Sequence, residues 1–252
     1  MLQNYYIERI NSPTDPRLEY AYESLLRPNF SPGEIEPIEK LRSLIEKTAS
    51  KAAKNPLVLM VAYNNHNNNP ESLISGNILD FGEVGCGAIG YTVTKTGYRR
   101  KGLASSLVGA FEKQIHENFE KPKLVIIEMR RGSKGFWDKV GYGHVQDRRK
   151  NVEYYQPPMD FNFKTGEPLY GEVRETLMAK FLNGEKDREE FRKWLMRSVE
   201  EVSKEWYAPE AARFKTEGAH QNALDYTRKV VQTNLHSIRN ATKLRLPNYR
   251  MR

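Results

Sequence analysis

The stretch from 89 to 104, IGYTVTKTGYRRKGLA, decides the fold of this chain. An apolar strand ends in a turn at Thr96-Gly97, and a basic run with a glycine then leads into a helix. The first turn of a helix has unpaired N–H groups and a partial positive charge, and glycine lets a ligand approach the backbone closely. The segment therefore predicts an anion-binding site, formed by Arg99, Arg100, Lys101, Gly102, Leu103 and Ala104.

Strands and helices alternate on both sides of this segment. Their periodicity predicts strands over 4–10, 57–63, 72–81, 84–94 and 123–129, helices over 16–26, 38–53, 102–119 and 133–140, and two short strands within 143–155. From Pro168 on, the pattern predicts helices only, with apolar stripes over 191–206 and 210–242. We therefore expect one domain over residues 1–160 and an all-helical C-terminal extension over residues 161–252.

Two motifs in this chain resemble signatures of the GNAT superfamily of acetyl-CoA-dependent N-acyltransferases. Arg99-x-x-Gly102-x-Ala104 resembles the pyrophosphate-binding motif of that family. Phe136-Trp137-Asp138-Lys139-Val140-Gly141-Tyr142 resembles its Phe-Tyr-Glu-Lys-Leu-Gly-Phe signature. The resemblance covers roughly residues 4–155 and implies an α+β fold, in which helices flank a mixed, splayed β-sheet.

The resemblance also implies how a ligand would bind. Coenzyme A would lie in the gap between the fourth and fifth strands, with its pantetheine arm on backbone groups of Val93 and Thr94 and its pyrophosphate on the 99–104 turn. Acetyl-CoA would be the co-substrate, without a metal. In this family the amine attacks the thioester directly, so we expect the lone Cys86 to pack in its strand rather than act as a nucleophile.

A direct attack needs a group that takes the proton of the amine. Glu128 is the candidate, because Ile127-Glu128-Met129-Arg130 is similar to the Leu-Glu-Val-Arg stretch of the N-terminal acetyltransferase branch, where that Glu is the base. The alternative is an ordinary carboxylate at a strand end that faces solvent or pairs with Arg130 or Arg131.

The acid for the leaving thiolate is harder to assign. Many relatives use the Tyr of the second motif, but this chain has Trp137 there, whose indole N–H is not a usable acid. Tyr142, Tyr154 or Tyr155 could replace it, although each also fits a packing role. A thiolate can also leave at neutral pH without an acid.

The composition agrees with an anionic ligand. The chain has 252 residues and a net charge of +8, and residues 95–150 alone hold 14 Lys/Arg against 6 Asp/Glu. A solvated basic face would explain the same excess. The seven-residue apolar run 57–63 is far shorter than the ~20 residues of a membrane span, and the N-terminus lacks an apolar signal region. We expect a cytoplasmic protein, and no metal site from the five scattered histidines.

The sequence allows several acceptors, acyl donors and partners. Glu34 and Glu36 lie in a loop of an acidic N-terminal region and suit a cationic primary amine, small molecule or peptide, or are simply exposed glutamates. Alternatives to acetyl transfer are a longer acyl chain, from acyl-CoA or an acyl carrier protein, and a catalytically silent GNAT-fold binding module. Nucleic acid is disfavoured as a partner, because no aromatic interleaving accompanies the basic run. The C-terminal stripe with Trp194 and Trp206 indicates burial in the chain's own core, a homodimer, or a lid.

Overall fold

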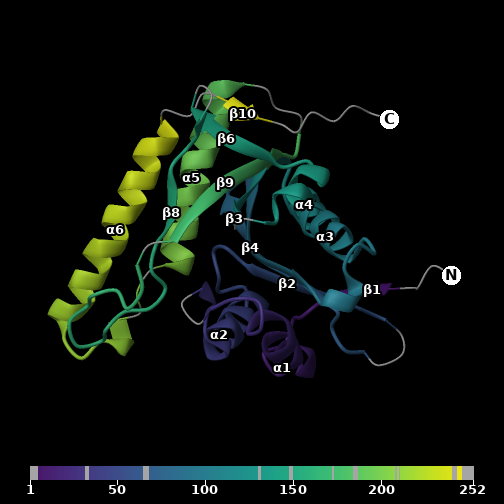
Figure 1. Ribbon diagram of the computed structural model, residues 1–252, viewed down its shortest axis with the longest axis horizontal. Helices are drawn as coiled ribbons and strands as arrows, with labels where there is room; N and C mark the ends of the chain where they lie inside the picture. The colour runs from purple at the N-terminus through teal and green to yellow at the C-terminus, as the bar shows by residue number, and fades with distance from the viewer. Residues whose placement is uncertain are drawn as a thin grey trace. The chain divides into compact units, whose positions relative to one another are not determined.

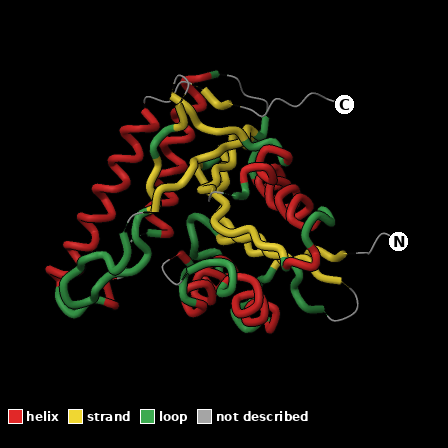
Figure 2. Tube along the Cα trace, viewed as in Figure 1, coloured by secondary structure: helices red, strands yellow, loops and turns green. Residues whose placement is uncertain are grey.

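The structure, a computed structural model, describes residues 5–31, 34–64, 68–129, 132–147, 150–171, 173–183, 187–207, 209, 211–239 and 243–245. The chain divides into two compact units, Met1–Pro122 and Lys123–Arg252. Figure 1 labels their helices and strands in chain order, and Figure 2 distinguishes helices, strands and loops.

Four antiparallel strands build the sheet of the first unit in the order β1-β2-β3-β4. They are β1 (Tyr5–Arg9), β2 (Leu57–Asn64), β3 (Ser72–Phe81) and β4 (Val84–Thr94). The helices are α1 (Pro16–Ala21), continued by one π-helical turn (Tyr22–Leu26), α2 (Ile38–Ala49), a 3-10 turn (Thr96–Tyr98) and α3 (Leu103–Asn118). The strands and helices expected in this region are therefore confirmed.

Strand alternation gives this sheet two apolar faces. One buried cluster includes Leu57, Leu59 and Val61 of β2. Leu18 of α1 and Leu41 of α2 belong to the same cluster. The opposite face is covered by α3, whose buried residues are Leu103, Leu107, Val108, Phe111 and Ile115. A Cβ at Gly76 of β3 would lie 3.0 Å from the Phe111 ring and 2.3 Å from the Ala88 carbonyl oxygen. The closeness of α3 to the sheet thus depends on a glycine at this position.

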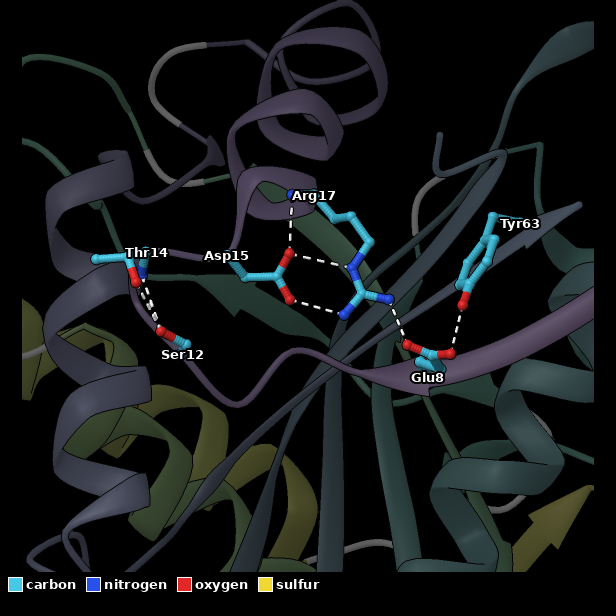
Figure 3. A network of polar contacts seen from close by, with 6 residues as sticks. All are labelled: Glu8, Ser12, Thr14, Asp15, Arg17 and Tyr63. Atoms are coloured by element: carbon cyan, nitrogen blue, oxygen red, sulfur yellow. Dashed lines mark hydrogen bonds and ion pairs between the residues drawn. The ribbon is translucent and has the colours of Figure 1, made fainter. Parts of the chain in front are cut away.

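A polar network fixes α1 to the edge of the sheet (Figure 3). Asp15 caps α1, accepting a hydrogen bond from the Arg17 backbone N–H at 2.9 Å, and pairs with the Arg17 guanidinium at 2.7 Å. Arg17 also reaches Glu8 of β1 at 2.5 Å, and Glu8 accepts a hydrogen bond from Tyr63 of β2. Hydrogen bonds from Tyr63 and Arg17 lower the pKa of Glu8, and that from Arg17 lowers the pKa of Asp15. Both carboxylates therefore stay ionised at neutral pH and hold α1 in place.

The second unit is built on a further antiparallel set of strands. They are β5 (Lys121–Met129), β6 (Gly143–Asp147), β7 (Lys150–Asn151), β8 (Tyr154–Gln156), β9 (Val173–Phe181) and β10 (Lys243–Arg245). β9 lies between β5 and β6, while β8 pairs with β9, and β7 and β10 pair with β6. Its helices are α4 (Lys134–Lys139), α5 (Arg188–Trp206), a 3-10 turn (Ala211–Arg213) and α6 (Glu217–Arg239).

The expectation of helices only after Pro168 is wrong at β9 and β10. The expected long helices are present as α5 and α6, but Val173–Phe181 forms a strand paired on both sides. Its apolar residues Leu177, Met178 and Ala179 are contiguous, so they fit a strand that is buried on both faces. The edges of β5 and β6 supply the hydrogen-bond partners that decide between strand and helix.

The C-terminal helices pack within the second unit. In Figure 1 α5 and α6 lie side by side, and α6 also contacts β8. Phe191 of α5 stacks on Phe181 of β9 with ring centroids 5.1 Å apart, and Trp194, Leu195 and Val199 are buried. The apolar stripe of α5 is thus covered by the chain itself. Among the described helices, none is long and apolar enough to cross a bilayer.

Candidate functional site

The predicted anion-binding segment forms an uncapped helix start in the first unit. Gly102 precedes α3 at φ 88°, in the left-handed region, and no side chain caps the helix there. Ser106 donates its N–H to the Gly102 carbonyl at 2.9 Å, so the N–H groups of the three residues before it precede the hydrogen-bonded ladder of the helix. Arg100 also has a positive φ of 63°, a conformation that costs a non-glycine residue of order 1 kcal/mol. Such strain is typical of ligand-binding turns.

Three consecutive basic residues form the part of this turn that precedes Gly102. Arg99, Arg100 and Lys101 are exposed, whereas Leu103 is buried in the core and Ala104 is half-buried. The Arg99 Nε donates to the Thr94 carbonyl at 3.1 Å, which ties the turn to the end of β4. The Lys101 ammonium lies 4.7 Å from the centre of the Tyr98 ring. The arrangement combines free N–H groups with three cations, which is the chemistry that binds phosphates.

Val93 and Thr94 end β4 beside this turn. They pair with Leu73 and Ser72 of β3, and the Ser72 hydroxyl donates to the Val93 carbonyl at 2.8 Å. The Ser72 and Thr94 hydroxyl oxygens are 2.7 Å apart. These contacts fix the strand end at which the family resemblance implies a pantetheine-binding role.

Glu128 of β5 lies in the second unit, in a cluster of tyrosines. One oxygen of its carboxylate accepts a hydrogen bond from the Tyr154 hydroxyl of β8, and the other accepts one from the Tyr207 hydroxyl. Tyr207 is the residue that ends α5 and is 3% exposed. Glu128 is half-buried, and Arg130 and Arg131, its other expected partners, lie outside the described residues.

The strand register explains why Tyr154 meets Glu128. Glu128 is opposite Leu177 of β9, and Tyr154 is opposite Glu175, two residues along the same strand. Residues two apart on a strand share a face, so Glu128, Glu175 and Tyr154 all lie on one side of the sheet. Burial raises the pKa of Tyr154 well above its ordinary value, and the Glu128 and Glu175 carboxylates add to this. Its hydroxyl is therefore a donor at any physiological pH.

The other tyrosines lie elsewhere. Tyr142 is fully buried after α4, where its ring meets Trp137 edge-on at 5.1 Å and the Lys180 ammonium at 5.8 Å. Tyr155 is opposite Arg174 and points to the other face from Tyr154. Of the three tyrosines considered as acids, the structure brings Tyr154 to Glu128 and places Tyr142 against the aromatic residues of α4.

The loop glutamates are not exposed. Glu34 is 9% and Glu36 5% exposed, and the Tyr91 hydroxyl of β4 contacts the Glu36 carboxylate and accepts its backbone N–H at 3.3 Å. The Ser31 backbone N–H donates to Glu34 at 2.9 Å. The interpretation of both as exposed loop carboxylates is therefore wrong, because both side chains are buried and their carboxylates contact protein groups, Ser31 and Tyr91.

Two further expectations concern the lone cysteine and a metal site. Cys86 is fully buried in β4, opposite Leu79, as expected for a packing residue. Within the described ranges, no group of three or more His, Cys, Asp or Glu residues could hold a metal ion, while His66 lies outside them.

Sequence reasoning missed Tyr207. The resemblance ends before α5, and Trp206-Tyr207 reads as the end of an amphipathic stripe. The stripe predicts that this end of the helix is buried but not that a hydroxyl there meets a carboxylate 79 residues away. No local pattern carries that information.

Comparisons with known proteins bear on the fold that carries these residues. Residues 82–151 match the family model described as FR47-like protein, which is related to the GNAT proteins. No curated protein sequence is significantly similar to the chain. A solved structure from Bacteroides thetaiotaomicron, described as a GNAT-family acetyltransferase, is 17% identical with a TM-score of 0.50 and covers 78% of this chain and 97% of its own.

Two other solved structures resemble the chain at lower TM-scores. The ribosomal-protein-S18-alanine N-acetyltransferase of Escherichia coli is 10% identical with a TM-score of 0.46, covering 73% of this chain and 97% of its own. The PaiA N-acetyltransferase of Thermoplasma acidophilum, solved with coenzyme A, is 15% identical with a TM-score of 0.45, covering 71% and 99%. The likeness to the Bacteroides structure shows the fold, and the expected α+β class with helices around a sheet is confirmed.

Proposed function

We propose that this chain, which has the GNAT fold and an FR47-like segment, is an N-acyltransferase that moves an acyl group from coenzyme A to a primary amine. Acetyl is the acyl group that the resemblance favours. The acceptor is a small molecule or a peptide that carries the amine. The single observation that carries the proposal is the turn before α3.

The turn fits the diphosphate of coenzyme A in three respects. Gly102 is left-handed, and a Cβ built there would meet nothing within 4 Å, so the approach to the backbone is open. The first turn of a 16-residue helix presents N–H groups and a partial positive charge. Arg99, Arg100 and Lys101 add three exposed cations. Val93 and Thr94, which lie immediately before the turn, are the residues proposed to bind the pantetheine arm.

In the proposed reaction the amine nitrogen attacks the thioester carbonyl carbon. The carbon–nitrogen bond forms, the carbon–sulfur bond breaks, and coenzyme A leaves as a thiolate. At neutral pH an amine of pKa about 10 is mostly the ammonium, which must lose one proton before it attacks and a second as the amide forms. Glu128 is the proposed base for the first proton, and the second goes to solvent. The contacts with Tyr154 and Tyr207 support this role, since they hold each oxygen of the carboxylate in one orientation.

For the leaving thiolate, Tyr142 is the proposed acid. It comes directly after the α4 segment in which Trp137 replaces the tyrosine of the resembling family. If Tyr142 gives a proton to the thiolate, Tyr142→Phe should lower kcat most below about pH 8.5, where the leaving sulfur ends as a thiol, and least at high pH, where it can leave as a thiolate. An unchanged pH–rate profile in this variant would assign the step to solvent.

The proposal is tested by binding and by turnover. Coenzyme A at a hundred times its Kd stabilises a protein by about 2.7 kcal/mol, which for a chain of this size raises Tm by roughly 5–10 °C. Release of free thiol from acetyl-CoA and from longer acyl-CoA, measured with a small polyamine and with peptides, separates the acyl groups and the acceptors. A chain whose Tm does not move and that releases no thiol from any acyl-CoA contradicts the proposal.

A further inference from the structure

We infer that Tyr207 and Tyr154 are positioning residues for Glu128, and that the C-terminal part of the chain thereby supplies a group that acyl transfer needs. The inference rests on the proposed function, because it gives Glu128 a role as base. It goes beyond the family resemblance, which ends before α5.

The three residues come together from separate elements of the second unit. Glu128 is on β5, Tyr154 is on β8, and Tyr207 follows the last residue of α5. Each oxygen of the carboxylate accepts one tyrosine hydroxyl, so neither oxygen can turn away without breaking a hydrogen bond. Tyr154 is fully buried and Tyr207 is 3% exposed, so water competes little for either hydroxyl.

Tyr207 is itself held at the end of its helix. Its backbone N–H donates to the Ser203 carbonyl at 3.3 Å, and the Ser203 hydroxyl donates to the Val199 carbonyl at 2.7 Å. Its ring meets the Trp206 ring at 6.2 Å, close to perpendicular. The end of α5 is therefore an ordered support and not a loose side chain.

The two hydroxyls leave the carboxylate able to work as a base. A carboxylate has about four lone-pair sites and a tyrosine hydroxyl donates only one proton, so the two tyrosine hydrogen bonds by themselves do not use up the acceptor capacity of a carboxylate. Hydrogen bonds to the ionised form favour that form over the protonated one. Titratable groups that face Glu128 include Tyr154 from β8 and Tyr207 at the end of α5. Glu175 of β9, which is opposite Tyr154, acts on the Tyr154 hydroxyl through its charge and helps to raise the pKa of that tyrosine.

The test compares Tyr207→Phe and Tyr154→Phe with Tyr170→Phe, which removes a hydroxyl from a tyrosine that is 52% exposed. The first readout is the pH profile of kcat and the KM for acyl-CoA. The second is independent of turnover: a pH titration of the full chain labelled with ¹³C at the glutamate side-chain carboxyl, in which Glu128→Gln identifies the Glu128 signal.

Loss of a donor should lower kcat about tenfold in Tyr207→Phe, with an unchanged KM for acyl-CoA. The acid limb of the pH profile and the Glu128 carbon signal should both move to higher pH, because the ionised carboxylate has lost a hydrogen bond. Tyr154→Phe should show the same direction, and it provides the test if Tyr207→Phe does not fold. Tyr170→Phe should match the wild-type chain in every readout.

The two possible failures are distinguishable. If the wild-type chain turns over no acyl-CoA but the Glu128 signal moves in Tyr207→Phe, the proposed function is wrong. Glu128 is then not a catalytic base, although the tyrosine does contact its carboxylate. If the wild-type chain is active and neither the acid limb nor the Glu128 signal moves in either variant, the tyrosines do not position Glu128 and the inference is overturned.

Discussion

The turn before α3 permits a sharp test, because the chain carries a second glycine of the same geometry. Gly102 lies at φ +88° and Gly82, between β3 and β4, at φ +85°. A Cβ built at either position meets nothing within 4 Å. Gly102→Ala and Gly82→Ala therefore impose the same backbone strain without a steric clash, and they differ only in what is near the glycine.

The expected magnitudes follow from this match. An alanine in the left-handed region costs roughly 1–2 kcal/mol, so both variants should lose about the same stability, or roughly 2–8 °C in Tm. Only at Gly102 does the new methyl group occupy the space through which an anion would reach the helix N-terminus. We expect the Kd for coenzyme A to rise at least tenfold in Gly102→Ala, which corresponds to about 1.4 kcal/mol, and to stay unchanged in Gly82→Ala.

Isothermal titration calorimetry with coenzyme A measures both constants, and thermal melts without ligand measure the strain. Because the control carries the same strain, a weaker Kd in Gly102→Ala alone cannot be a general effect of lower stability. Equal affinity in the wild-type chain and Gly102→Ala, with the expected loss of Tm present, would refute the assignment of the diphosphate to this turn.

Two further predictions concern stability. The lowered pKa of Glu8 means that its pair with Arg17 stabilises the fold above the unfolded-state pKa of Glu8 and is lost as the pH falls through its folded-state pKa. Arg17→Met should therefore lose about 1 kcal/mol or less of unfolding free energy in urea at pH 7, since the pairs of Arg17 with Glu8 and Asp15 are partly exposed, and this difference should shrink as the pH falls through the folded-state pKa values of the two carboxyls. Asn234 is fully buried and bonds both backbone groups of Tyr155, at 2.9 and 2.7 Å, so Asn234→Leu should cost about 2 kcal/mol in urea melts. Gln221→Leu, on the exposed side of the same helix, should change stability by less than about 0.5 kcal/mol.

The first unit could be predicted from the sequence because its signals are local. The apolar run at 57–63 becomes β2, and the basic turn with its glycine becomes the start of α3. β9 could not be predicted in the same way, because three contiguous apolar residues among charged ones fit either a buried strand or a helix. Its state is set by the free edges of β5 and β6, which come from distant parts of the chain.

The candidate site likewise has one part that local sequence determines and one part that depends on tertiary packing. The left-handed backbone at Gly102 follows from the residue type and its position before a helix, so the anion-binding turn could be predicted from the sequence. The surroundings of Glu128 depend on Tyr207, which tertiary packing alone brings to the carboxylate. The burial of Glu36 could not be predicted for the same reason, because its carboxylate meets the Tyr91 hydroxyl of a strand more than fifty residues later, whereas the Glu34 carboxylate has a local partner in Ser31.

The division of the chain into a domain over residues 1–160 and an extension over residues 161–252 stays a prediction. The register of β9 indicates how a chain that ends at residue 160 should behave. β9 pairs with β5 from Leu124 to Met129 and with β6 at Gly143 and His144. A chain that ends at residue 160 would keep β5 and β6 but lose the strand between them, which leaves two unpaired strand edges and exposes Ile126 and Ile127, each 2% exposed or less in the full chain. We therefore expect residues 1–160 expressed alone to aggregate or to show no cooperative melt, whereas the full chain unfolds cooperatively. A soluble 1–160 chain that melts cooperatively and binds coenzyme A would mean that residues 161–252 are a separable addition and that Tyr207 is not needed to hold the site together.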